Sequence, residues 1–195
     1  MITARRQAEY TPMPSESGTN EPLSYNKYLK VRELLDLQRT LSEPTSHDEL
    51  LFIIIHQTYE LWFRQILHEI DATIQWLNEG RHFRVNHSLK AVTEIESVLV
   101  GQIHVLESMA QIGFLEFRDK LNPASGFQSM QFREIEFVSG LKDERIIASF
   151  EDDDYALARL RVRLERPTLA DAFWALLGRD GFAVVTNEDK VASIV

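Results

Sequence analysis

The feature that most constrains the fold is a helical pattern that runs without a break for about 30 residues between Ser46 and Gly80. Ser46 and Glu49 have the spacing of a capping box, in which each side chain accepts a hydrogen bond from the other residue's amide. Gly80 stands where a left-handed residue would end the helix. A helix this long crosses a whole domain, and its largely apolar circumference predicts a central position.

The rest of the chain also shows helical spacing, without the alternation of a strand. Two further long helices are expected over residues 23–41 and 85–112. Shorter helices are predicted over residues 114–121, 128–138, 146–150, 155–164 and 168–177, the last with Thr168 as N-cap and Asp171 three residues on. The sequence therefore predicts an all-α protein built as a bundle of long helices.

Composition divides the chain into two parts. Residues 1–22 are rich in Pro, Ser, Thr, Asn and Glu and poor in large apolar side chains. Such a segment buries too little apolar surface to offset its ordering entropy, so we expect a flexible arm. Residues 23–195 are expected to form a single helical domain, since this length supports one hydrophobic core.

Several classes of protein are excluded by composition. There is no cysteine, so disulfides, thiolate zinc sites and iron–sulfur clusters are ruled out. Thirty acidic residues against 21 basic ones give a net charge of -9, which disfavours nucleic acid as a partner. The longest apolar run, residues 50–55, is too short to span a membrane, and no apolar leader follows the N-terminus. We expect a cytoplasmic protein.

His56 is the most informative titratable residue. It follows a run of apolar side chains in the long helix and lies on the same face as Phe52. An imidazole in such surroundings needs a hydrogen-bond partner. Two interpretations stay open at this point: a core histidine bonded to a neighbouring side chain, or a histidine that faces a ligand.

Arg118 is the second unusual residue, because Phe114 and Phe117 place its guanidinium in an apolar neighbourhood. An arginine there either holds a ligand carboxylate or makes an internal ion pair. Tyr25 and Tyr28 share one helix face, where core packing and a binding surface are both open. Together with Phe52 and His56, these residues suit a pocket for an aromatic amino acid.

The same residues lie in sequence blocks that resemble the tryptophan 2,3-dioxygenase family. The blocks are Ser24-Tyr25-x-x-Tyr28-Leu29, then His47-Asp48-Glu49-x-Leu51-Phe52-Ile53-Ile54-Ile55-His56-Gln57-x-Tyr59-Glu60-Leu61-Trp62-Phe63, then Phe117-Arg118-x-x-Leu121-x-x-Ala124-Ser125-Gly126-Phe127-Gln128-Ser129-x-Gln131-Phe132-Arg133. Arg166-Pro167-Thr168-Leu169 continues the pattern. The resemblance covers about residues 23–185 and is specific, because the blocks occur in the right order and spacing.

The resemblance implies a haem-dependent oxidoreductase of the kynurenine pathway that adds O2 to L-tryptophan and forms N-formyl-L-kynurenine, with haem b as cofactor. By similarity, His56 would be the distal histidine that binds the indole N–H, and Phe52 would pack against the indole. Arg118 would hold the substrate carboxylate. Ser125 and Gly126 would line the pocket beside haem.

The resemblance also implies an assembly. The family's counterparts of Tyr25, Tyr28 and Leu29 reach into the site of a neighbouring subunit, which implies an interface at the N-terminal helix and a homotetramer of intertwined dimers. Phe114 stands where the family usually has a tyrosine that assists the carboxylate clamp. This chain therefore lacks one hydroxyl donor, and its substrate affinity or its choice of substrate is expected to differ from that of the usual family member.

The family's proximal haem histidine lies in a C-terminal region without a counterpart in these 195 residues, where no histidine follows His104. Three interpretations stay open. The chain is a split or truncated dioxygenase completed by another polypeptide, a shortened homologue with a different haem ligand, or a degenerate member. A degenerate member would bind an indole amino acid or a partner subunit without catalysis. An enzyme must take up haem, whereas a binding module would be free of haem.

Overall fold

The computed structural model describes residues 22–184, which fall into two units divided between Leu37 and Gln38. Within this part of the chain every regular element is helical and no strand forms, which confirms the predicted all-α class. The arm expected over residues 1–22 lies almost wholly outside the described residues. That arm, and the single domain expected over residues 23–195, stay predictions.

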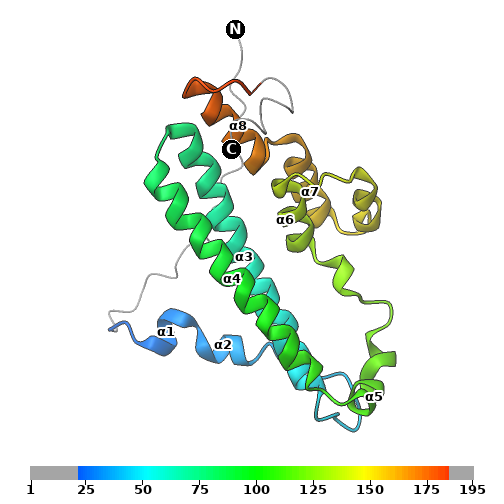
Figure 1. Cartoon of the computed structure of the whole chain (residues 1–195). Coiled ribbons are helices and arrows are strands. Elements are labelled where there is room, and N and C mark those ends of the chain that lie inside the picture. The colour runs from blue at the N-terminus through cyan, green and yellow to red at the C-terminus, as the bar shows by residue number, and fades with distance from the viewer. Residues whose placement is uncertain (1–21, 185–195) are drawn as a thin grey trace. The chain divides into compact units, whose positions relative to one another are not determined.

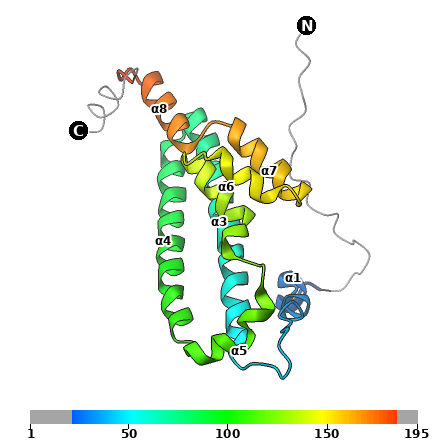
Figure 2. The ribbon, with the colours of Figure 1, turned by 90° about the vertical axis from the view of Figure 1, so that its right-hand side faces the viewer.

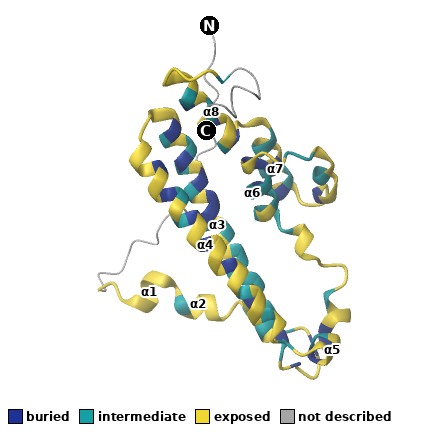
Figure 3. Cartoon of the chain, viewed as in Figure 1, coloured by how far each residue is buried: buried dark blue, intermediate teal, exposed yellow. Residues whose placement is uncertain are grey.

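The first unit contains two short helices, α1 (Tyr25–Leu29) and α2 (Val31–Leu35). The prediction of one helix over residues 23–41 was wrong, because Lys30 adopts a left-handed conformation, with φ of 53°, that interrupts the helix. Figure 3 shows that exposed residues dominate both elements. Apolar periodicity stabilises a long helix mainly through packing, and this unit buries none of its helical side chains.

The second unit is built on a hairpin of two long helices that lie side by side, α3 (Glu49–Glu79) and α4 (His82–Glu107), as Figures 1 and 2 show. The end of α3 is confirmed, since Gly80 adopts the left-handed conformation there, with φ of 71°. The main core lies between these helices and the later α6, and its buried residues are Ile66, Leu67, Ile70, Val92, Ile95, Leu99 and Val138. Because α3 packs against both α4 and α6 in this core, it has the central position that was predicted for the long helix.

The start of α3 differs from the predicted capping box. The Ser46 hydroxyl donates to the Glu116 carboxylate over 2.8 Å and to the Gly113 carbonyl, instead of capping the helix. The buried Glu49 carboxylate accepts from the backbone amides of Leu41, at 2.6 Å, and Ser42, at 3.0 Å, and from the Ser42 hydroxyl. Both side chains therefore fix the loop before α3 rather than its first turn.

The second long helix is shorter than the predicted span of 85–112. It ends at Glu107, and α5 (Gln111–Leu121) follows at a bend of 104° between the two helices. The bend returns the chain to the N-terminal end of α3, which α5 contacts. Within residues 22–184, no single helix has both the length and the apolar composition to cross a membrane. Among these residues, only α4 and α5 taken together, across the bend, meet both criteria.

The chain continues through short elements. These are η1 (Gly126–Gln128), α6 (Met130–Ser139), η2 (Glu144–Phe150), α7 (Asp154–Glu165) and α8 (Leu169–Arg179). The helix predicted over 128–138 begins at Met130, and the segment predicted as a helix near 146–150 is a 3-10 helix. The capping box of Thr168 and Asp171 forms as predicted. Phe137, Phe150, Ala156 and Leu160 make a second small core.

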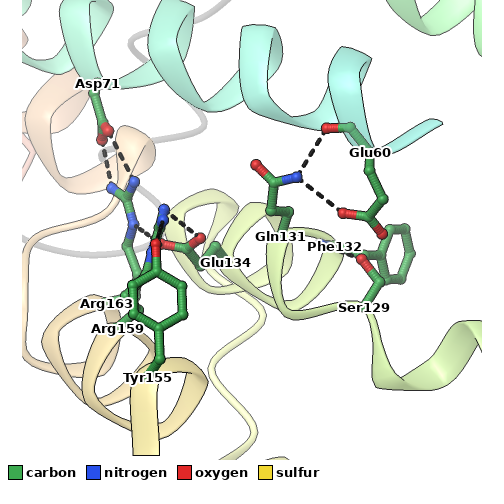
Figure 4. Close-up of polar contacts among 9 residues, drawn as sticks. All are labelled: Glu60, Asp71, Ser129, Gln131, Phe132, Glu134, Tyr155, Arg159 and Arg163. Carbon is green, nitrogen blue, oxygen red and sulfur yellow. Dashed lines mark hydrogen bonds and ion pairs between the residues drawn. The ribbon is translucent and has the colours of Figure 1, made fainter. Parts of the chain in front are cut away.

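An ion-pair network ties α6 and α7 to the C-terminal half of α3 (Figure 4). Glu134, whose side chain is 2% exposed, accepts from Arg159 at 2.7 Å and from Arg163 at 3.1 Å. Arg163 also pairs with Asp71 of α3, with one contact at 2.8 Å. Burial alone would lower the pKa of Arg163, but its bonds to Asp71 and Glu134 hold that pKa above the ordinary value.

Candidate functional site

A cavity of about 680 Å³ lies where α5 and the loop after it meet the N-terminal half of α3. Its lining residues are Phe52, Phe114, Leu115, Arg118, Asp119, Leu121, Asn122, Pro123 and Ala124. Phe52 comes from α3, whereas the others follow one another along α5 and the adjoining turn. The cavity thus combines an aromatic wall with two charged side chains, and its volume falls in the range of small-molecule sites.

The aromatic wall is held by mutual ring packing. The ring centroids of Phe52 and Phe114 are 5.9 Å apart, and Phe117 lies 5.5 Å from Phe52 and 5.4 Å from Phe114. Phe117 is fully buried, with 0% exposure. It therefore supports the two rings that face the cavity, and offset or edge-to-face pairs at these distances are favourable. The wall presents flat apolar surface to any ligand in the cavity.

His56 lies next to this wall, one helical turn after Phe52. The two rings have centroids 4.1 Å apart, and the His56 Nδ1 lies 2.7 Å from the Phe52 carbonyl oxygen. A carbonyl only accepts, so Nδ1 carries the proton and donates. The partner is thus a backbone carbonyl rather than the side chain of the core interpretation. In the neutral ring Nε2 is left as an acceptor, and it has no hydrogen bond within the described chain.

Arg118 lines the cavity in an exposed position. Its guanidinium makes no hydrogen bond or ion pair with any of residues 22–184. The internal ion pair that the sequence left open is therefore not formed among those residues. A guanidinium with five donors at a cavity wall is suited to a carboxylate ligand, which it can bind with two parallel bonds.

Two contacts fix α5 against the start of α3. The hydrogen bond from Ser46 to Glu116 crosses between the preceding loop and α5. Gly113 is buried so tightly that a Cβ there would lie 2.0 Å from Oδ2 of Asp48. Because Phe114 and Arg118 lie on the same helix, these contacts set the positions of the aromatic wall and the guanidinium.

Glu49 makes the loop before α3 sensitive to acid. Burial would raise the pKa of its carboxyl group, but the hydrogen bonds from Leu41 and Ser42 outweigh burial and hold the pKa below the ordinary value of 4.5. The ionised form is therefore the one that the loop stabilises. This loop carries Ser46, so its order bears on the placement of α5.

Other predicted site residues do not line this cavity. Ser125 is the N-cap of η1, where its hydroxyl accepts from the Phe127 amide at 3.3 Å, and Gly126 begins that element. Tyr25, Tyr28 and Leu29 belong to the first unit, in which they are 75%, 71% and 43% exposed. The two tyrosines are therefore not core residues of that unit, and their role at a partner's site stays a prediction.

The prediction from sequence missed the other lining residues, which are Leu115, Asp119, Leu121, Asn122, Pro123 and Ala124. Their only signal was their closeness to Arg118 in the chain, together with the turn chemistry after Leu121. Across the described part of the chain, no group of three or more His, Cys, Asp or Glu side chains could hold a metal ion.

Comparison with known proteins identifies the family. The family model for tryptophan 2,3-dioxygenase matches residues 11–181. A tryptophan 2,3-dioxygenase from Nocardioides sp. is 50% identical over 177 residues, which cover 88% of this chain and 66% of the relative. Another from Herpetosiphon aurantiacus is 44% identical over 172 residues, covering 87% and 65%.

A third tryptophan 2,3-dioxygenase, from Anaeromyxobacter sp., is 41% identical over 172 residues and is covered to 64% of its length. The chain thus spans somewhat less than two thirds of the length of these relatives. The match is continuous through the segment that carries His56, Arg118 and the cavity-lining turn. The chain therefore belongs to the tryptophan 2,3-dioxygenase family.

Proposed function

We propose that this chain forms the substrate side of a haem-dependent dioxygenase site that converts L-tryptophan and O2 to N-formyl-L-kynurenine. One observation carries the proposal most directly. An unpartnered guanidinium and an aromatic wall line the same cavity, and an imidazole packs against that wall. The names of the family and of its relatives supply the substrate.

The cavity recognises the two ends of tryptophan differently. Arg118 binds the carboxylate with two charge-assisted hydrogen bonds, and no internal carboxylate among the described residues competes for it. Phe52 and Phe114 pack against the indole ring. Phe114 adds no hydroxyl to the clamp, so carboxylate binding depends more heavily on the guanidinium than it would with a tyrosine at this position.

His56 orients the indole. Its Nδ1–H is held by the Phe52 carbonyl, and Nε2 accepts the hydrogen bond of the indole N–H. In the neutral ring with its proton on Nδ1, Nε2 can only accept a hydrogen bond, so this form of the imidazole selects an N–H group. The same contact aligns His56 with the ring of Phe52, whose face the indole shares.

The proposal places haem at the loop of Ser125 and Gly126, and one observation supports room for it there. A Cβ added at Gly126 would meet nothing within 4 Å, so there is open space next to the loop that carries Ser125. Ser125 and Gly126 would line the haem face there, and haem supplies the iron for the oxygen chemistry when it is bound. We assign no axial ligand among residues 22–184.

The assembly is also part of the proposal. Tyr25, Tyr28 and Leu29 are exposed on α1, a surface that a second subunit would cover. We propose that they complete the site of a neighbouring subunit in a homotetramer, as the family resemblance implies. The cytoplasmic location that we expect from the sequence belongs to this proposal as well.

Calorimetric titration of the full chain with L-tryptophan tests substrate binding. We expect Arg118→Ala to weaken binding by at least about tenfold, since it removes a charge-assisted contact, while the unfolding temperature stays unchanged. Arg161→Ala is the matched control, because Arg161 is exposed on α7 away from the cavity lining. Equal affinity in Arg118→Ala and the unmodified chain would contradict the clamp.

Anaerobic titration of the reduced protein with haem tests the cofactor. We expect a stoichiometric haem spectrum that changes when L-tryptophan is added. Haem that stays free, combined with intact tryptophan binding, would contradict dioxygenase activity of this chain and support the alternative, a module that binds an indole amino acid without catalysis.

A further inference from the structure

A second cavity, of about 450 Å³, lies at the end of the α3–α4 hairpin that is far from α5. Figures 1 and 2 show α8 near the turn between α3 and α4, and α5 at the opposite end of the two helices. Within residues 22–184, this second cavity shares no lining residue with the cavity of Arg118. Its volume falls in the range of small-molecule sites, and it exceeds the roughly 150 Å³ of an engineered apolar cavity that binds benzene.

The walls of the second cavity are mostly apolar and come from regularly spaced residues. Val85 and Leu89, one helical turn apart, line it from α4. Leu169, Phe173 and Leu176, which share one face of α8, line it as well. The ring of Phe173 is 38% exposed, so part of its apolar surface is left for a ligand to cover. Aromatic rings pack favourably against one another, and such a wall therefore favours a ligand that contains a ring.

Contacts within the chain hold these walls in place. The Arg179 guanidinium donates to the Leu77 carbonyl oxygen, which joins the last turn of α8 to the last turn of α3. Thr168 and Asp171 form the capping box that begins α8, and Gly80 ends α3 before the chain enters α4. The cavity is therefore formed before a ligand enters, and binding does not have to order the helices around it.

Three polar side chains line the second cavity and have no partner of their own. His82 and Asn86 lie four residues apart on one face of α4, and Ser139 is the last residue of α6. None of these side chains makes a hydrogen bond with another residue in the range 22–184. They are available to a ligand that carries a hydrogen-bonding group.

The charge of the ligand follows from what the lining lacks. Among the described residues, no Lys, Arg, Asp or Glu side chain lines the second cavity. A charged ligand would lose part of its hydration there without gaining an ion-pair partner, which is costly. An uncharged ring with one polar group can instead bury the ring against the apolar walls and satisfy its polar group.

We propose that the second cavity binds a small uncharged aromatic compound with one hydrogen-bonding group, of the size of indole. Its ring packs against Phe173 and the leucines of α8, and its polar group bonds with His82, Asn86 or Ser139. The site is separate from the cavity of Arg118, so the inference goes beyond the proposed function.

Titration of the full chain with indole, followed by the NMR signals of backbone amides, tests the proposal. We expect saturable shifts in residues 82–89 and 169–176. Ala170→Phe places a ring in the cavity and should weaken indole binding there by at least about tenfold. Ala175→Phe is the matched control, because Ala175 is also exposed on α8 but is not among the lining residues. Signals that indole leaves unchanged, or equal affinity in the two variants, would overturn the site.

A second pair of variants tests the polar contact. Asn86→Leu keeps the size of the side chain and removes its amide, so we expect indole to bind about fivefold more weakly. Asn78→Leu makes the same change at an exposed position of α3 outside the lining and should preserve the affinity. Equal affinity in these variants would overturn the contribution of Asn86.

L-tryptophan in the same experiment tests the chemical class, since it has the ring of indole and carries two charges. We expect it to leave the signals of residues 169–176 unchanged. Saturable shifts there, at an affinity equal to that of indole, would overturn the assignment to uncharged compounds. The outcome is independent of the proposed function, which is read from the signals of residues 114–121 and from Arg118→Ala.

Discussion

Two groups of charged residues, one beside each half of α3, differ in whether their charges have ion-pair partners. Near its C-terminal half, Glu134 is 2% exposed and bonded to Arg159 and Arg163. Near its N-terminal half, Arg118 and Asp119 line a cavity and have no partner within residues 22–184. One group uses its charges to join helices, and the other leaves them available to a ligand.

The comparison separates structural charges from functional ones. Arginines of the first group are as conspicuous in the sequence as Arg118, and α7 alone contains Arg159, Arg161 and Arg163. Their chemistry differs only because of what lies around them. A buried charge must be paired to be tolerated, whereas an unpaired charge can persist only where solvent or a ligand reaches it.

The largest expected effect is on the paired group. Glu134→Gln removes a buried charge that balances Arg159 and Arg163, so we expect the free energy of unfolding to fall by roughly 3–5 kcal/mol. Urea denaturation followed by circular dichroism measures it. Glu94→Gln, at an exposed position of α4, should change stability by less than about 0.5 kcal/mol. Equal stability of the two variants would show that the network is not structural.

The next effect concerns the joint between α5 and α3. Gly113→Ala places a Cβ against Asp48, so we expect a loss of about 2 kcal/mol in stability and weaker tryptophan binding through displacement of Arg118. Gly101→Ala is the matched control. Nothing lies within 4 Å of a Cβ at Gly101, and the change should stabilise the α4 helix by about 1 kcal/mol. Thermal unfolding and calorimetric titration of both variants decide the outcome, and a fully stable Gly113→Ala would contradict the close contact.

A smaller effect concerns the unpaired charges at the cavity. Arg118→Lys keeps the positive charge but loses the planar pair of donors, so we expect L-tryptophan binding to weaken by about tenfold. The free energy of unfolding should stay within about 0.5 kcal/mol of the original, since the guanidinium supports no other described residue. Full affinity with lysine would indicate that charge alone, rather than two parallel hydrogen bonds, holds the ligand.

The smallest effect is a dependence of stability on pH through Glu49. Its pKa is held below 4.5 in the folded chain, so its stabilising contribution is present above that pH and is lost as the pH falls through the folded-state pKa. Glu49→Gln should lower stability at neutral pH and flatten the decline in acid. Urea titrations at a series of pH values measure this, with Glu94→Gln as control. A decline in acid as steep in Glu49→Gln as in the original chain would assign it to other carboxylates.

Much of the fold could be predicted from residue patterns that act locally. The span of α3 follows from apolar periodicity, and its end follows from a glycine, Gly80, that readily adopts the left-handed conformation. The capping box at Thr168 follows from two residues within one helical turn. The errors come from a distant partner in one case and from a helix without buried side chains in the other. Ser46 bonds Glu116 from far along the chain, and the left-handed Lys30 divides a helix whose periodicity was continuous.

The site residues that could be predicted from the sequence are polar or charged side chains among apolar neighbours. His56 in an apolar run and Arg118 among phenylalanines were conspicuous for that reason, and the structure places both beside Phe52 or in its cavity. Asp119 was not, because an exposed carboxylate on a helix is ordinary in a sequence. Only the three-dimensional arrangement shows that it lines a cavity and that no described residue pairs with it.

The most direct test of the distinction between paired and unpaired charges is the NMR signal of each arginine Nε–Hε group during titration with L-tryptophan. The signal of Arg118, assigned by its loss in Arg118→Ala, should shift in a saturable manner as the ligand binds. Those of Arg159 and Arg163 should stay unchanged, since Glu134 and Asp71 already hold them. Saturable shifts of Arg159 or Arg163 with a constant Arg118 signal would contradict the account.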